Sequence, residues 1–241
     1  MPMCTVLLRF APGEPWPLLL AAVRDEFVDR AWDPPDRYWG DRLVGGRDRT
    51  AGGTWLAVDP TRAAVAAVLN GVRLPPHEAG VRPTRGTLPL EALRGNAPEG
   101  GGHDGFHLLL GTPTEVRLWS WDGAELVDRS LPPGEHIVVN RGIGLPDAPV
   151  VAHFLPLLSA AASPSEGQST LDFWADWVTM LAGDGIDPAD PRALLVRRVY
   201  AERTYGSTSA SLVAVRDGAV RYDFTGAPAD PARWRRVLPN P

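Results

Sequence analysis

The sequence predicts an α+β fold in which helices cover antiparallel sheets. Predicted strands come first, two helical segments follow, and strands return near the end of the chain. This order is typical of antiparallel sheets with helices laid over them. Many strands are short and are separated by Asn-Gly, Asp-Gly or Pro-Gly pairs, which favour tight turns between neighbouring strands. With 241 residues, 44% of them hydrophobic, the chain can form one substantial core, so we expect a single domain over residues 1–241.

The first predicted element is a hairpin of two apolar strands at 5–10 and 18–23. The turn-forming residues 11–16 separate the two strands. Neither strand alternates between apolar and polar side chains, which indicates that neighbouring layers cover both of its faces. We therefore expect these two strands at the centre of the fold.

Residues 33–53 are rich in Pro, Gly, Asp and Arg and predict a long loop. The glycines at its end do not form a phosphate-binding loop, because the Lys-Ser/Thr ending and the strand-to-helix setting of such loops are missing. A strand pair at 55–58 and 64–69 follows, and its second strand ends at Asn70-Gly71, a turn signal.

The middle of the chain predicts a second long loop and then a group of short strands. Residues 73–104 contain several prolines and a run of three glycines, so we expect loop structure with a short helix at 90–93. Turn signals separate the segments that follow, which predicts an antiparallel meander. Its four strands are expected at 106–110, 116–121, 125–128 and 136–139.

Two helices and a final strand pair complete the prediction. The first helix is expected at 152–162, where the chain is apolar, and the second at 170–182, where apolar residues recur at three- and four-residue spacing. Gly183 ends the second helix. A polar linker at 163–169 separates the two helices. Beyond the second helix we expect a short helical piece at 192–197, strands at 210–215 and 219–224, and a solvated Pro/Arg tail at 226–241.

Composition excludes several classes of function. The formal net charge is −5 and the arginines are spread among acidic residues, so no nucleic-acid partner is expected. No apolar run approaches the roughly 20 residues that a membrane span requires. His103 and His107 are four residues apart, but one lies in a predicted loop and the other on a predicted strand, so we expect no metal site. These features favour a soluble, cytoplasmic protein without a cofactor.

Cys4 is the single cysteine of the chain and the first candidate for chemistry. If the mature chain begins at Cys4, that residue carries both a thiol and an α-amine. The ordinary pKa of such an amine is about 7.7–8.0 and that of the thiol about 8.5, so the amine can accept the thiol proton. Alternatively, Cys4 is only a small buried apolar residue. If Met1 alone is removed, Pro2 becomes terminal and Cys4 stays internal.

Several short blocks together resemble the NRDE family, whose members include proteins like transport and Golgi organisation protein 2. The blocks are Met3-Cys4-Thr5, Val23-Arg24-Asp25-Glu26-Phe27, Gly52-Gly53-Thr54-Trp55-Leu56, Asn70, Arg85-Gly86, Asn140 and Tyr205-Gly206. This resemblance implies a four-layer αββα sandwich similar to the N-terminal-nucleophile hydrolases. The chain departs from the family pattern at Val23, where the family has Asn.

The resemblance also implies a role for each candidate site residue. Cys4 would attack a carbonyl carbon, Asp25 would orient the α-amine, and Arg24 would favour the thiolate. Asn70 and Asn140 each end a predicted strand, where a side-chain amide can donate to a developing oxyanion. Other interpretations stay open: a surface ion pair for Arg24 and Asp25, and turn formation for the two asparagines.

Two functions follow from the resemblance. One is a cysteine amidohydrolase that acts on a small-molecule amide. The other is a non-catalytic carrier of haem or lipid cargo, in which His103 would ligate haem and some of the nine tryptophans would cover it. For either function, we expect Cys4, Asp25, Asn70 and Asn140 to meet at one end of the central strands.

Overall fold

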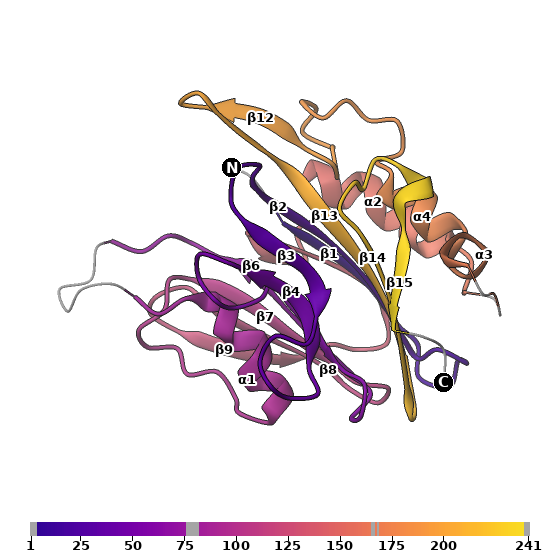
Figure 1. Ribbon diagram of the computed structural model, residues 1–241, viewed down its shortest axis with the longest axis horizontal. Helices are drawn as coiled ribbons and strands as arrows, with labels where there is room; N and C mark the ends of the chain where they lie inside the picture. The colour runs from indigo at the N-terminus through magenta and orange to yellow at the C-terminus, as the bar shows by residue number, and fades with distance from the viewer. Residues whose placement is uncertain (1–3, 76–81, 165–166, 168, 239–241) are drawn as a thin grey trace.

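The computed structural model describes residues 4–75, 82–164, 167 and 169–238, which form two antiparallel sheets that face each other (Figure 1). Within these residues the first sheet has eight strands: β1 (Thr5–Phe10), β2 (Leu18–Phe27), β10 (Gly134–Val139), β11 (Gly142–Ile143), β12 (Arg197–Tyr200), β13 (Arg203–Arg216), β14 (Ala219–Thr225) and β15 (Arg235–Leu238). The second has seven: β3 (Trp32–Asp36), β4 (Val44–Asp48), β5 (Leu56–Asp59), β6 (Ala64–Asn70), β7 (Phe106–Gly111), β8 (Val116–Trp121) and β9 (Leu126–Ser130).

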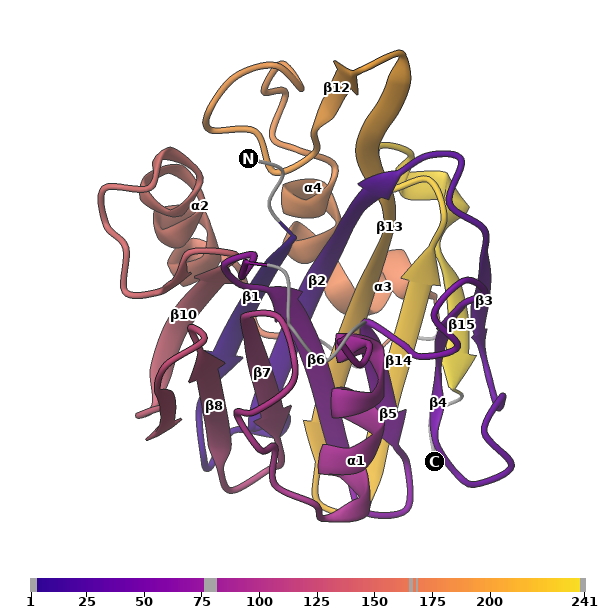
Figure 2. The same cartoon turned by 90° about the vertical axis from the view of Figure 1, so that its left-hand side faces the viewer.

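Helices cover the outer face of each sheet. Over the first sheet lie α2 (Pro149–Ala160), α3 (Thr170–Trp174) and α4 (Asp176–Leu181). Over the second lies α1 (Leu88–Arg94), which follows the short 3-10 turn η1 (Arg85–Thr87) and stands in front of that sheet in Figure 2. Three apolar clusters hold the layers together, one between the sheets and one beneath each group of helices. The α+β class is therefore confirmed, with layers in the order helix, sheet, sheet, helix.

The predicted hairpin lies at the centre of the first sheet. Strands β1 and β2 pair from Thr5 opposite Val23 to Phe10 opposite Leu18. Strand β10 borders β1 on its other side, and β13 borders β2. Side chains of β1 alternate between the cluster beneath the helices and the cluster between the sheets, so both of its faces are buried. This double burial explains why the strand lacks alternation between apolar and polar residues.

The prediction of one four-stranded meander is wrong for its last strand. Strands β7, β8 and β9 form a meander in the second sheet, whereas β10 pairs with β1 in the first. The burial patterns explain the separation. Strand β9 is mostly exposed, as an edge strand can be, but β10 buries Ile137 and Val139 beneath the helices and Val138 between the sheets.

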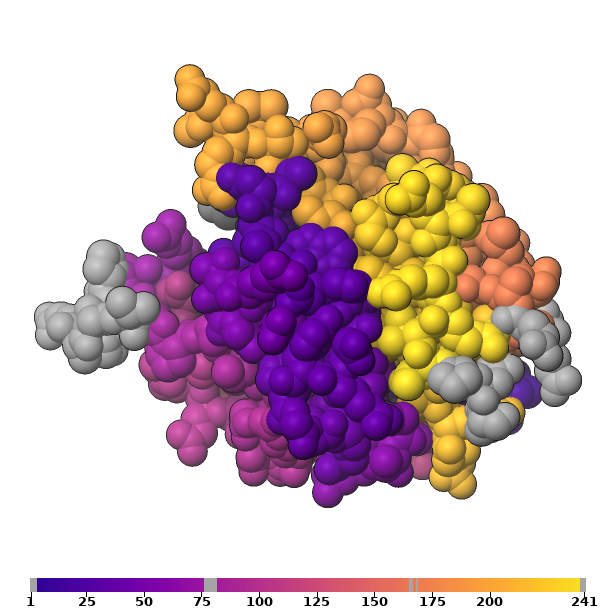
Figure 3. Space-filling view, in the orientation of Figure 1, coloured from indigo at the N-terminus to yellow at the C-terminus, as the bar shows by residue number. Residues whose placement is uncertain are grey.

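The segment predicted as a loop at 33–53 contains strands β3 and β4. Strand β3 tolerates Pro34 and Pro35 because it lies at the edge of the second sheet, where a missing backbone N–H breaks few ladder hydrogen bonds. In β4, a Cβ atom on Gly45 would come within 2.5 Å of the Leu56 carbonyl oxygen, so this glycine permits close packing against β5. Figure 3 shows this indigo and purple segment beside the yellow carboxyl-terminal strands.

The helix predicted at 170–182 is broken at Ala175. This residue has φ 36°, which ends α3 and begins α4. The break lets the Trp174 indole donate a hydrogen bond to the Asp223 carboxylate at 2.9 Å, while the Trp177 indole donates to the Ala162 carbonyl at 3.2 Å. Leu171, expected on the buried face, is 49% exposed. Gly183 follows with φ 98°, as expected of a residue that ends a helix.

Two predictions in the last third of the chain are wrong. Residues 192–197 contain no helix; strand β12 begins at Arg197 and pairs with β13. The segment predicted as a solvated tail contains a short 3-10 turn η2 (Pro231–Arg233) and strand β15, which pairs with β14. Val237 and Leu238 pack against the core between the sheets, and this burial stabilises the strand. Among the described residues, no helix has the length and apolarity needed to cross a membrane.

Candidate functional site

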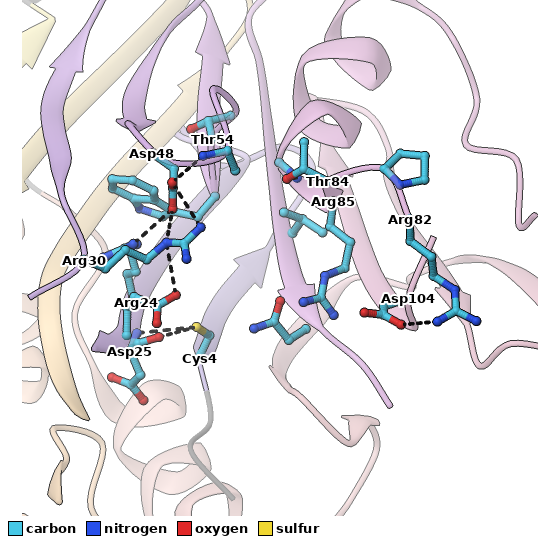
Figure 4. A pocket seen from close by; sticks show the side chains of 17 residues that line it. Cys4, Arg24, Asp25, Arg30, Asp48, Thr54, Arg82, Thr84, Arg85 and Asp104 are labelled. Carbon is cyan, nitrogen blue, oxygen red and sulfur yellow. Dashed lines mark hydrogen bonds and ion pairs between the residues drawn. The ribbon is translucent and has the colours of Figure 1, made fainter. Parts of the chain in front are cut away.

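A pocket of about 320 Å³ lies where β1 and β2 meet the ends of β6 and β7. Its lining combines residues near Cys4 with residues from the two segments that were predicted as long loops (Figure 4). The described lining residues with charged, thiol or amide side chains are Cys4, Arg24, Asp25, Glu26, Arg30, Asp48, Asn70, Arg82, Arg85 and Asp104. Cys4, Arg24, Asp25 and Asn70 thus lie around one pocket, and Asn140 is not part of its lining.

Cys4 directly precedes β1, and the pairing of Thr5 with Val23 places it beside Arg24 and Asp25. The backbone N–H of Asp25 donates to Cys4 Sγ at 3.4 Å, and the thiol donates to the Asp25 carbonyl at 3.5 Å. Burial, together with the Asp25 carboxyl, raises the pKa of the Cys4 thiol to about 12. In this arrangement the thiol is neutral near pH 7 and needs a base to become a nucleophile.

Asp25 has a buried carboxyl group, and only one of its two oxygens accepts a hydrogen bond from the described residues. The hydroxyl of Ser207 donates to Oδ1 at 2.6 Å, from a point where β13 bulges between Ser207 and Ser209. Oδ2 is buried and has no hydrogen-bond partner among the described residues. Burial raises the pKa of Asp25 to about 8, against the opposing effects of the Ser207 hydrogen bond and the Arg24 charge.

Arg24 is only 5% exposed, so the interpretation of a surface ion pair is wrong for this residue. Its Nη1 donates to the Thr208 hydroxyl at 2.8 Å, and its guanidinium lies 4.6 Å from the centre of the Trp55 ring. Nη2 forms an ion pair with Asp48 at 3.5 Å. Burial lowers the pKa of Arg24, and nearby acidic groups partly offset that effect. The guanidinium is therefore fixed by contacts on several sides.

Asp48 organises the neighbouring turn, and sequence reasoning missed it. Its carboxylate accepts hydrogen bonds from the backbone N–H groups of Thr50 and Ala51, both at 2.9 Å, and from Arg30 at 2.6 and 3.1 Å. Hydrogen bonds and ion pairs of this kind hold the pKa of Asp48 below its ordinary value although burial opposes them. An aspartate that precedes Thr by two residues is a signal for such a turn and could have identified it.

Arg85 also lines the pocket, although the sequence assigned it no role. Its position depends on close contact between two glycine-containing blocks: the Thr54 backbone N–H donates to the Gly86 carbonyl at 2.8 Å. A Cβ atom on Gly53 would come within 2.4 Å of the Gly86 carbonyl carbon. Only glycine at position 53 allows this approach without a shift of the backbone. Arg85 Nη1 donates to the Gly105 carbonyl at 3.0 Å.

The two candidate oxyanion donors occupy different surroundings. Asn70 ends β6, is exposed and lines the pocket. Asn140 follows β10, and its carbonyl accepts a hydrogen bond from His107 Nε2 at 3.3 Å. Burial lowers the pKa of His107, which favours the neutral imidazole. Of the two, Asn70 is the amide that lies in the pocket with Cys4.

Among the described residues, the lining of the pocket is rich in charged side chains and includes no histidine. No group of three or more His, Cys, Asp or Glu residues within the described ranges could hold a metal ion. His103, the predicted haem ligand, is outside the lining, and its Nδ1 lies 3.2 Å from the Pro83 carbonyl oxygen. Trp119 and Trp174 are buried in the apolar clusters beneath the helices, and charged side chains dominate the pocket where haem would need apolar contacts.

Comparison with known proteins identifies the family. No curated protein matches the chain. The family described as "Transport and Golgi organisation 2" matches residues 3–131, slightly more than half of the 241 residues. The matched range includes Cys4, Arg24, Asp25, Asn70 and Arg85, which the fold brings to one pocket. The chain therefore belongs to the Transport and Golgi organisation 2 family.

Proposed function

We propose that this pocket is an N-terminal-nucleophile-type cysteine site that hydrolyses a small-molecule amide, in a fold of the N-terminal-nucleophile hydrolase type. The observation that carries the proposal is the buried Oδ2 atom of Asp25, which lacks a hydrogen-bond partner among the described residues beside Cys4. An unpaired buried carboxylate oxygen is costly and marks a place where a donor is missing. The α-ammonium of a terminal Cys4 would supply that donor.

The same α-amino group, in its neutral form, would resolve the difficulty posed by the thiol. The pKa of Cys4 is raised to about 12, so its neighbours do not themselves generate a thiolate. An α-amine with an ordinary pKa of about 7.7–8.0 is a suitable base near neutral pH. Asp25 would hold the amine in place, and protonation of the amine would lower the pKa of Asp25 from about 8.

The proposed reaction proceeds in two halves. The neutral amine takes the thiol proton while Sγ bonds to the amide carbonyl carbon, and the Asn70 amide donates to the resulting oxyanion. The carbon–nitrogen bond then breaks, the leaving amine takes the proton from the ammonium, and an acyl thioester remains on Cys4. Water next attacks the thioester with the amine as base, which releases a carboxylic acid and restores the thiol.

The test compares two forms of the chain, each verified by intact mass. One begins at Cys4 and the other retains the preceding residues. With a panel of small amides, the form that begins at Cys4 should release free amine, and the longer form and a Cys4→Ala variant should not. Hydrolysis by the Cys4→Ala variant would contradict the proposal. So would saturable haem binding by both forms without any hydrolysis, which would support the carrier function instead.

A further inference from the structure

We propose that Arg85 binds a carboxylate of the ligand, so that the pocket selects amides that carry one carboxylate group. That the ligand is an amide rests on the proposed function. The binding of its carboxylate to Arg85 does not depend on hydrolysis. It is carried by the placement of Arg85, a half-buried guanidinium in the wall of the pocket without a carboxylate partner.

Arg85 differs from the other cations of the pocket in its surroundings. Among the described residues its one hydrogen bond goes to the neutral Gly105 carbonyl, and no carboxylate lies within ion-pair distance. Burial lowers the pKa of Arg85, and the charges of Asp104 and Glu26, which form no ion pair with it, offset that effect only in part. An anionic ligand would stabilise a partly buried cation that lacks an ion-pair partner.

The other three arginines of the pocket are already paired with acids. The pairs are Arg82–Asp104 at 3.1 Å, Arg30–Asp48 at 2.6 Å, Arg30–Glu26 at 3.7 Å and Arg24–Asp48 at 3.5 Å. Together these interactions account for every acidic residue in the described part of the lining except Asp25. Arg85 is thus the cation whose charge remains uncompensated.

The charge balance indicates the kind of anion. Asp25 adds no uncompensated negative charge, whether it is protonated or pairs with a terminal ammonium, so the described residues of the lining have an excess of one positive charge. A single carboxylate neutralises this excess, whereas a doubly charged phosphate would leave the pocket negative. The planar guanidinium also suits a carboxylate, because it can donate two parallel hydrogen bonds to the two oxygens.

The location of Arg85 is compatible with a ligand that also reaches the thiol. Figure 4 shows Arg85 between Cys4 and the Arg82–Asp104 pair, and Arg85 and Cys4 come from different parts of the fold. A small ligand can therefore place its carboxylate at Arg85 and its amide carbonyl towards Cys4. The site is consistent with an N-acyl amino acid or another amide of similar size.

The test uses the Cys4→Ala variant, which binds ligands without turning them over. Calorimetric titration would compare N-butyrylglycine with its uncharged analogue N-butyrylglycinamide. A charge-assisted hydrogen bond should make the carboxylate bind about ten- to a hundredfold more tightly. Adding Arg85→Gln should abolish this preference while affinity for the carboxamide stays unchanged, and adding Arg85→Lys should keep part of it.

An Arg117→Gln variant provides the matched control, because Arg117 is a partly exposed residue of β8 that pairs with Asp128, and neither residue lines the pocket. It should leave the preference intact. Equal affinities for the two probes in the Cys4→Ala variant would overturn the proposal, and so would a preference that survives Arg85→Gln. If Arg85→Gln fails to fold, the affinities of the two probes for the Cys4→Ala variant, with and without Arg85→Lys, still test the proposal. A retained preference without hydrolysis by the form that begins at Cys4 would reject the amidase function alone.

Discussion

Two buried aspartates of the first sheet differ in how their oxygens are satisfied. Asp223 on β14 accepts hydrogen bonds from the Thr170 hydroxyl at 2.5 Å, from the Trp174 indole at 2.9 Å and from Arg221 Nε at 2.8 Å. Asp25 on β2 accepts one from Ser207 through Oδ1, and its Oδ2 has none among the described residues. Both carboxyl groups are almost fully buried.

This difference separates a structural acid from a candidate functional one. The bonds to Asp223 tie α3 to the first sheet, and the Arg221 charge balances the carboxylate in the interior. Asp25 lies in the wall of a pocket, and its surroundings raise its pKa instead of stabilising its charge. Burial alone therefore does not indicate function. A buried carboxyl oxygen that lies beside a nucleophile and lacks a hydrogen-bond donor is the better indicator.

The largest effect is expected when the Asp223 cluster is broken. Arg221→Met removes the buried counter-charge and leaves Asp223 ionised in the interior, which should lower the free energy of unfolding by about 3–5 kcal/mol. For a chain of this size each kcal/mol lowers Tm by about 2–4 °C, so thermal unfolding should show a clear decrease. The double variant Arg221→Met/Asp223→Asn should regain part of the loss. An unchanged Tm in Arg221→Met would show that the cluster contributes little.

A smaller effect of opposite sign is expected at Asp25. In the chain that retains residues before Cys4, the folded pKa of about 8 exceeds the unfolded value of about 3.9. The folded state therefore holds one more proton between these values, and its stability falls as pH rises from about 4 to about 8. Asp25→Asn should remove this loss and raise the free energy of unfolding near pH 9, on the order of a few kcal/mol, with little gain near pH 4.

Denaturant unfolding at several pH values measures this effect, and Asp59→Asn serves as the control. Despite burial, hydrogen bonds from Thr61 and Arg42 hold the pKa of Asp59 below its ordinary value. Asp59→Asn should therefore destabilise the protein most above about pH 4, the opposite trend. In the form that begins at Cys4, the ammonium should pair with Asp25, so Asp25→Asn should no longer raise the free energy of unfolding near pH 9. An equal rise in both forms would contradict that pairing.

Local patterns were sufficient to predict much of the fold. The hairpin at the start of the chain, the strand pair that ends at Asn70 and the two helical regions were predicted because apolar runs and turn residues are short-range signals. The sheet to which a strand belongs is a long-range property, so β10 was misplaced. The break at Ala175 accompanies a hydrogen bond from Trp174 to Asp223, about fifty residues further along the chain, and no local pattern records this contact.

The candidate site could be predicted only in part for the same reason. Cys4, Arg24 and Asp25 lie in blocks that resemble a known family, whereas the contacts that define their states come from distant strands. Ser207 reaches Asp25 from β13. Asp48 was missed because a segment rich in Gly, Pro and Asp resembles a loop, and its ion pairs exist only after β3 and β4 have formed. Arg85 was missed because it lies in the second predicted loop, and its place in the pocket depends on the contact of Gly86 with Gly53 and Thr54, which are distant in the sequence.

The smallest of these effects is expected at Ser207, the one described donor to the Asp25 carboxyl. Its hydroxyl also accepts a hydrogen bond from the Val196 backbone N–H at 2.9 Å, so Ser207→Ala should cost about 1 kcal/mol at any pH. In the chain that retains residues before Cys4, the Ser207 hydrogen bond also lowers the pKa of Asp25, so its loss should raise that pKa further. The destabilisation should then be greater near pH 9, where Asp25 is ionised, than near pH 6. In an Asp25→Asn background the pH-dependent part should vanish and the constant part should remain; an equal loss at both pH values with Asp25 present would mean that Ser207 does not influence this carboxyl group.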